Sequence, residues 1–212
     1  MKKKTLQGII RFLVNTLTKI TYIDMDHIPA EGGVILALNH LSFFDTPVVL
    51  VNERRPDVTA LVTTKYEKKF FISWFINTAE GIWINRDIAD FSAIQKASKA
   101  LKAGKAVGIA PEGTRSEKNQ LQEGKPGTVM LAVKSGMPIV PLAITGTEDA
   151  FQKMLRFQRP TITVRFGKAF TIPPLEPGHR SRQLKEWTEI VMMRIAELLP
   201  ESYRGVYRDK VG

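Results

Sequence analysis

The chain has 212 residues, 43% of them hydrophobic and 25% charged, which suits one well-packed domain. It contains no cysteine, so disulfides, thiolate metal sites and cysteine nucleophiles are excluded, and histidines at 27, 40 and 179 alone do not favour a metal centre. The net charge of +10 indicates an anionic partner, which composition leaves open between nucleic acid, a membrane surface and phosphorylated ligands.

The N-terminal segment predicts an amphipathic helix over residues 5–20. One stripe of this helix carries apolar residues at spacings of three and four, namely Leu6, Ile9, Ile10, Leu13, Leu17 and Ile20. Basic residues surround the stripe, a pattern typical of a helix in a membrane interface. A helix packed on the protein's own core is the alternative. The apolar run is interrupted by polar residues, so we expect neither a signal peptide nor a spanning helix.

Strands and helices alternate after this segment. We expect strands at residues 34–38, 58–63, 81–84, 106–110, 139–145 and 161–166. We expect helices from Asp45, which would cap the first of them, and at 70–76, 88–103, 127–135, 148–155 and 181–199. The alternation predicts an α/β fold with a mixed, largely parallel sheet flanked by helices. Residues 1–26 would form a membrane-anchoring helical segment and residues 27–212 the α/β domain.

Polar clusters follow three of these strands, where α/β sheets bind ligands. The first is Asn39-His40-Leu41-Ser42-Phe43-Phe44-Asp45. Across a strand-to-helix turn the Asp45 carboxylate can meet Nδ1–H of His40 and leave Nε2 as a base. A loop histidine and a simple helix cap are the alternative.

The second cluster, Pro111-Glu112-Gly113-Thr114-Arg115-Ser116, offers a flexible glycine, a guanidinium fork for phosphate and backbone N–H groups for an oxyanion. The third, Gly81-Ile82-Trp83-Ile84-Asn85-Arg86, ends a strand with an arginine. Either cluster alone is compatible with an ordinary polar turn or a surface arginine.

Taken together and in this order, the clusters resemble the glycerophosphate acyltransferase family, whose large bacterial branch is the 1-acylglycerol-3-phosphate acyltransferases. The first is similar to its His-x4-Asp block, and the second matches Pro-Glu-Gly-Thr-Arg-Ser residue for residue. Asn85 stands where the third block commonly has Asp. Val140-Pro141-Leu142-Ala143-Ile144 resembles the fourth block, and Lys125 sits in a Lys-x-Gly position. The resemblance spans residues 33–146.

The resemblance implies that His40 is the general base, oriented by Asp45, in direct transfer from acyl-ACP or acyl-CoA to the sn-2 hydroxyl of lysophosphatidic acid, forming phosphatidic acid without a cofactor or metal. The chain agrees on its own terms, because it lacks a cysteine and a Gly-x-Ser-x-Gly elbow. The family's substrate-binding residues carry over to Arg86, Glu112, Gly113, Thr114 and Arg115. Glu112 would accept a bond from the glycerol hydroxyl, and the Gly113–Thr114 backbone would face the oxyanion.

Further basic residues are candidates for headgroup or carrier contacts, with solvated surface charge as the alternative: Lys105, Lys125, Arg156 and Arg159. A second membrane segment is expected at residues 70–76, which carry Phe70, Phe71, Trp74 and Phe75 between flanking lysines, although core packing also explains them. These features predict a peripheral or monotopic protein on the cytoplasmic side of an anionic cell membrane.

Three other functions stay open. The same machinery could serve another lysophospholipid or glycerol 3-phosphate, and the chain could be a lipid-surface binding protein without turnover. The intact His40 and Asp45 count against the last. Nucleic-acid binding would explain the charge, but zinc-finger spacing, basic repeats and RNA-binding aromatic motifs are missing from the sequence, so we expect no nucleic-acid partner.

Overall fold

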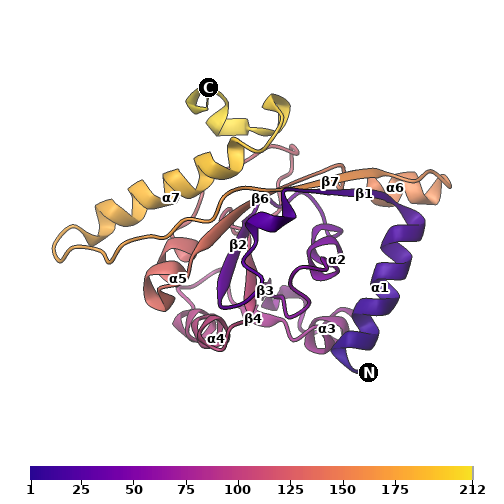
Figure 1. The fold of residues 1–212 in the computed structure, drawn as a ribbon, viewed down its shortest axis with the longest axis horizontal. Helices are drawn as coiled ribbons and strands as arrows, with labels where there is room; N and C mark the ends of the chain where they lie inside the picture. The colour runs from indigo at the N-terminus through magenta and orange to yellow at the C-terminus, as the bar shows by residue number, and fades with distance from the viewer. Residues whose placement is uncertain (212) are drawn as a thin grey trace.

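The computed structural model describes residues 1–211, and its central feature is a seven-stranded sheet with helices on both faces (Figure 1). The strands stand in the order β1-β7-β6-β2-β5-β3-β4. Their bounds are β1 Lys19–Ile23, β2 Val34–Leu38, β3 Thr59–Thr63, β4 Ile82–Ile84, β5 Ala106–Ile109, β6 Ile139–Thr145 and β7 Thr161–Phe166. All neighbours are parallel except β6 and β7, which confirms the predicted mixed, largely parallel sheet.

Seven α-helices within residues 1–211 surround the sheet. They are α1 Lys3–Leu17, α2 Asp45–Leu50, α3 Phe70–Thr78, α4 Phe91–Lys102, α5 Gly127–Ser135, α6 Ala150–Leu155 and α7 Arg180–Ala196. Short 3-10 turns cover Met25–His27, Thr64–Tyr66, Glu201–Tyr203 and Gly205–Lys210. Most expected elements occur within a few residues of their predicted bounds.

The sheet separates two hydrophobic cores. On one face α4, α5 and α7 bury residues such as Leu101, Leu131 and Met192 against Ile35 and Val107. On the other face α1 and α2 pack against the alternate residues of the same strands. Strands buried on both faces read as continuous apolar runs, which is why β2, β5 and β6 stand out in the sequence.

The chain reverses direction across the sheet at β2. It moves from β2 through β3 and β4 to β5 on one side, then crosses to β6 on the other. In such sheets the loops after the strands on either side of the reversal diverge and leave a crevice at their carboxyl ends. The loops after β2, β5 and β6 therefore meet at one place.

The N-terminal segment differs from its prediction in extent. The helix ends at Leu17, and Lys19–Ile23 pairs with β7 as an edge strand. β-Branched and aromatic residues favour a strand here, which the helical spacing of Leu17 and Ile20 concealed. The sheet thus begins inside the segment 1–26 that we expected to stand apart from the α/β domain.

The apolar stripe of α1 is also divided. Leu6 and Ile10 are buried with Val14 against the protein, and buried Gln7 donates through Nε2 to the carbonyls of Leu50 and Pro56. The predicted membrane contact is therefore wrong for Leu6 and Ile10, which pack on the core. The exposed apolar residues of α1 are Ile9, Phe12, Leu13 and Leu17. Within residues 1–211 no helix has the length and hydropathy needed to cross a bilayer.

Candidate active site

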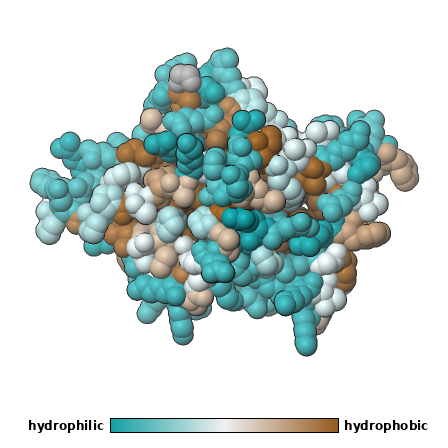
Figure 2. Space-filling model, viewed as in Figure 1, coloured by the Kyte–Doolittle hydropathy of each residue, from teal (hydrophilic) through white to brown (hydrophobic). Residues whose placement is uncertain are grey.

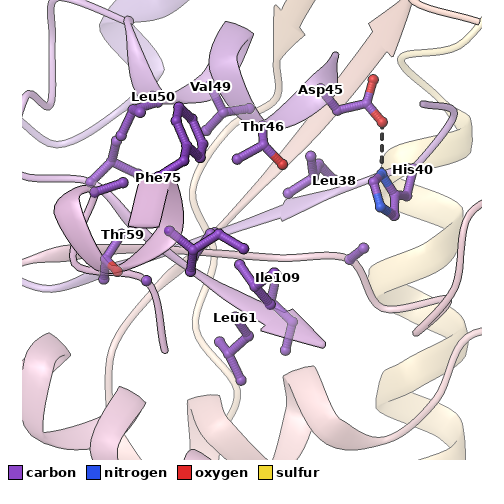
Figure 3. A pocket seen from close by; sticks show the side chains of 18 of the residues that line it. Leu38, His40, Asp45, Thr46, Val49, Leu50, Thr59, Leu61, Phe75 and Ile109 are labelled. Atoms are coloured by element: carbon purple, nitrogen blue, oxygen red, sulfur yellow. Dashed lines mark hydrogen bonds and ion pairs between the residues drawn. The ribbon is translucent and has the colours of Figure 1, made fainter. Parts of the chain in front are cut away.

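His40 and Asp45 lie in the loop that follows the central strand β2 and in the first turn of α2 (Figure 3). His40 Nδ1 is 2.7 Å from Asp45 Oδ2, and Asp45 is only 1% exposed. A carboxylate has no proton to give, so Nδ1–H is the donor and Nε2 carries the free lone pair. The pair therefore has the geometry of a base and its orienting carboxylate.

Asp45 does not cap α2, contrary to the sequence prediction. Its Oδ2 accepts from the backbone N–H groups of Leu41 and Ser42 at 2.8 and 2.9 Å, which precede the helix. These bonds curl the loop back so that the carboxylate faces Nδ1 of the imidazole (Figure 3). A helical spacing of five would have pointed the two side chains apart.

Glu112 holds the loop after β5 against the loop after β2. Its Oε1 accepts from the backbone N–H of His40 and its Oε2 from that of Gln122, both at 3.0 Å. Ser116 N–H also donates to the His40 carbonyl at 2.8 Å. Burial raises the pKa of Glu112 to about 7, although the two N–H donors oppose the shift.

Because Glu112 is 2% exposed and both its oxygens are used, it positions the backbone of His40. The expectation that it accepts a hydrogen bond from the glycerol hydroxyl does not fit this geometry. Gly113 also differs from its expected role, because its N–H donates to the carbonyl of Ala110 and is not free for an oxyanion.

A large groove opens beside His40. Its volume is about 810 Å³, and its walls come from the loops after β2, β3, β4 and β5 together with α3 and α6. The groove brings Arg86, Arg115 and Lys125 to the same space as His40. Thr114 also lines this groove, as does Phe75 of the aromatic segment. Residues of all three polar clusters from the sequence analysis therefore line the same groove.

The two arginines are held differently. Arg115 is exposed, donates to Tyr66 Oη at 3.0 Å and lies 5.3 Å from the ring centre of Phe43. Arg86 is half-buried, and burial lowers the pKa of its guanidinium, which nevertheless stays charged at neutral pH. Lys125 runs along Gly113, where an added Cβ would lie 3.0 Å from the lysine side chain and where the φ of 71° favours glycine.

A narrower apolar pocket continues from His40 beneath α2 and α3 (Figure 3). Its walls are mainly aliphatic, with polar groups from His40, Asp45 and two threonines, and Arg86 lines both this pocket and the groove. The residues that Figure 3 labels along it include Leu38, Val49, Leu50, Leu61, Phe75 and Ile109. Its volume is about 70 Å³, so these mainly apolar walls suit a short length of hydrocarbon better than a polar ligand.

Two predicted contact residues lie apart from this site. Lys105 stands at the amino end of β5, where its Nζ contacts Glu80 at 2.8 Å. Arg159 donates to the carbonyls of Asn15 and Thr18 and fastens the end of α1. Neither residue lines the groove or the apolar pocket. Of the lysines offered for headgroup or carrier contact, Lys125 is the one beside His40.

Two further side chains, to which the sequence motifs assign no separate role, support this geometry. Thr147, after β6, donates through Oγ1 to Asp45 Oδ1 at 2.5 Å. Asn39 bonds both backbone groups of Ile144 through its side chain, at 2.9 and 2.7 Å, and so ties β2 to β6. The available signal was the position of Gly146-Thr147 just past a buried strand.

Comparison with known proteins gives a consistent result. Residues 19–145 match the family model described as Acyltransferase. The 1-acyl-sn-glycerol-3-phosphate acyltransferase of Borreliella burgdorferi is 28% identical over 66% of this chain and 56% of its own length. The corresponding Bacillus subtilis protein is 24% identical over 82% of this chain and 84% of its own length.

A solved structure shares the fold. The crystal structure of the 1-acyl-sn-glycerophosphate (LPA) acyltransferase PlsC from Thermotoga maritima has a TM-score of 0.67 at 21% identity, over 89% of this chain and 76% of that one. The chain spans less than two thirds of the Borreliella relative and of a Mycoplasma pneumoniae relative. The family model covers more than half of the chain, which therefore belongs to the acyltransferase family.

Proposed function

We propose that the protein transfers a fatty acyl group from an acyl thioester to the sn-2 hydroxyl of lysophosphatidic acid and so forms phosphatidic acid. The observation that carries the proposal is the His40–Asp45 pair, 2.7 Å apart, at the junction of a cationic groove and an apolar pocket. The names of the Borreliella and Bacillus relatives support the same substrate.

The reaction needs one proton to move twice. His40 Nε2 takes the proton of the acceptor hydroxyl as its oxygen attacks the thioester carbonyl. Asp45 stabilises the imidazolium that forms. When the tetrahedral intermediate collapses, the carbon–sulfur bond breaks and the imidazolium returns the proton to the leaving thiolate. The products are an ester and a free thiol, and no acyl-enzyme is required.

The charges around His40 suit an acceptor with a phosphate. Arg86 and Arg115 present guanidinium groups to the groove, and a guanidinium binds phosphate through paired N–H donors. Lys125 adds a third positive charge on the wall formed by Gly113. We assign the two arginines to the phosphate of the acceptor and the apolar pocket to one short part of a fatty acyl chain.

A lipid substrate requires access from a membrane, and exposed apolar residues gather on three helices. They are Ile9, Phe12, Leu13 and Leu17 of α1, Phe70, Phe71 and Trp74 of α3, and Phe151, Leu155 and Phe157 on and after α6. Apolar atoms appear in Figure 2 along the edge where Figure 1 places α1 and α6. Phe71 and Phe151 also line the groove.

We infer that these residues rest in the interface of an anionic membrane, with the groove open towards the lipid. Phe157, fully exposed beside Arg156, fits such an interface better than water. Lys65, Lys68 and Lys69 near α3 would contact lipid phosphates. The protein would then be peripheral or monotopic, on the cytoplasmic side where acyl thioesters are made.

A purified assay tests the proposal. Acyl-ACP and acyl-CoA donors are each offered with lysophosphatidic acid, a neutral lysophospholipid and glycerol 3-phosphate. We expect the highest kcat/KM with lysophosphatidic acid, because the groove offers two guanidinium groups for its phosphate. A higher value for glycerol 3-phosphate would replace the proposed acceptor. Loss of transfer in His40→Ala, with an unchanged melting temperature, would assign the base.

A further inference from the structure

The carboxylate of Asp45 is held from both sides, and the second side comes from a distant part of the chain. Its Oδ2 accepts from His40 Nδ1–H and from two backbone N–H groups. Its Oδ1 accepts from the hydroxyl of Thr147, 102 residues further along, at 2.5 Å. We propose that Thr147 is a positioning residue for catalysis, which fixes the Asp45 carboxylate and through it the His40 imidazole.

Burial makes the Thr147 hydroxyl a dedicated donor. Thr147 and Asp45 are each 1% exposed. A carboxylate oxygen enclosed by protein needs a donor, and its loss leaves a charged acceptor without a partner. Without Thr147, Oδ1 would seek another donor by rotating the carboxylate or by taking a proton. Either change disturbs the bond to His40.

Backbone and side-chain contacts fix the conformation of the loop that carries Thr147. Gly146 has a φ of 82°, and a side chain there would collide with the carbonyl oxygen of Thr161 on β7. Gly146 N–H donates to Glu148 Oε2 at 3.0 Å. The other oxygen of Glu148 accepts from Tyr203 Oη–H at 2.5 Å, which links the loop to the C-terminal 3-10 turns.

Thr147 lies outside the two spaces in which substrates would bind. Thr147 lines neither the groove nor the apolar pocket, whereas His40 lines both. A bound acceptor or donor would therefore not touch it. Its removal should lower kcat and leave KM nearly unchanged, because it acts on the base and not on the ground-state complex.

Two substitutions isolate the hydroxyl. Thr147→Val keeps the shape and removes the donor, whereas Thr147→Ser keeps the donor. We expect kcat to fall about ten- to a hundredfold in Thr147→Val, the size of one hydrogen bond to a charged group, with KM within about twofold. Thr147→Ser should restore most of kcat. Thr147→Ala makes the same test if the valine variant does not fold.

Thr188→Val is the matched control. Thr188 in α7 is 6% exposed and donates to the carbonyl of Leu184 at 2.6 Å, away from the groove. The same loss of a buried hydroxyl there should reduce stability without reducing kcat.

The inference rests on the proposed acyl transfer, so a second readout must not depend on turnover. With three histidines in the chain, the imidazole ¹⁵N and Nδ1–H signals of His40 can be assigned through His40→Ala. We expect the hydrogen-bonded Nδ1–H signal in wild type and Thr147→Ser, and its loss or broadening in Thr147→Val. If the wild-type protein transfers no acyl group to any lysophospholipid, the proposed function is refuted, whereas the role of Thr147 in holding Asp45 is still tested by the Nδ1–H signal. A Thr147→Val protein with wild-type kcat, or with the wild-type Nδ1–H signal, would overturn the role of Thr147.

Discussion

Replacing Asp45 with Asn separates the charge of this carboxylate from its hydrogen bonds. An amide oxygen at the Oδ2 position can still accept from His40 Nδ1–H and from the backbone N–H groups of Leu41 and Ser42. The amide nitrogen then occupies the Oδ1 position, where the Thr147 hydroxyl can turn to accept from it. The imidazole should therefore keep its orientation and tautomer while it loses its counter-charge.

The lost stabilisation applies only when His40 is protonated during transfer. His40 is 17% exposed and Asp45 1%, so water screens the pair weakly. Unit charges about 4 Å apart interact by about 4 kcal/mol at an effective dielectric constant of about 20. The barrier to acyl transfer should rise by about that amount, which corresponds to a rate about a thousandfold lower.

The assay is steady-state acyl transfer to lysophosphatidic acid by wild type, Asp45→Asn and Asp45→Ala, with thermal unfolding of each. We expect Asp45→Asn to melt near wild type and to lose about three orders of magnitude in kcat. Asp45→Ala should also lose stability, because two backbone N–H groups lose their acceptor. A folded Asp45→Asn protein within tenfold of wild type would refute the electrostatic role of Asp45.

The remaining predictions concern Glu112, Arg86 and the exposed apolar surface. Burial raises the pKa of Glu112 from 4.5 to about 7. Between these two pH values the folded state holds a proton that the unfolded chain has released. The free energy of unfolding therefore falls as pH rises from 4.5 to about 7. Glu112→Gln should remove this decrease, which is on the order of 3 kcal/mol, when the free energy of unfolding is measured in urea between pH 4 and 8. An equal decrease in wild type and Glu112→Gln would contradict the raised pKa of Glu112. Arg86→Ala should raise KM for lysophosphatidic acid about tenfold or more, with a smaller rise in Arg86→Lys; equal KM values in all three proteins would remove its phosphate contact. The double substitution Phe12→Ser and Phe157→Ser should weaken binding to anionic vesicles at least about tenfold. Val206→Ser, at another exposed apolar residue, should leave vesicle binding unchanged. An equal loss in the double variant and in Val206→Ser would refute the proposed membrane-binding surface.

The fold was largely predictable because the central strands β2, β5 and β6 are buried on both faces and read as continuous apolar runs. Six of the seven strands are predicted from the sequence, as apolar runs or as alternating segments such as β7. The seventh, β1, follows a helix directly, and its pairing with β7 joins residues about 140 positions apart. Local spacing cannot reveal such pairing. The apolar stripe of α1 was also visible, but spacing alone did not show that Leu6 and Ile10 face the core while Leu13 and Leu17 face outward.

The site was predictable where its residues follow strand ends and not where it depends on backbone partners. The carboxyl ends of parallel strands meet at one edge, which brings His40, Arg86 and Arg115 to one groove. The two bonds of Glu112 go to backbone N–H groups, which carry no sequence signal, so the motif alone predicts a substrate contact instead. Thr147 stayed hidden because its partner lies on a neighbouring strand loop, 102 residues away.

The most direct measurement follows an isotope-labelled acyl group from a thioester donor into lipid, by mass spectrometry, with wild type and His40→Ala at equal concentration. Label in phosphatidic acid with wild type, and none above background with a folded His40→Ala, is the predicted result. Equal labelling by both proteins would show that His40 is not the base. No labelled phosphatidic acid from wild type with either acyl-ACP or acyl-CoA would contradict the proposed function itself.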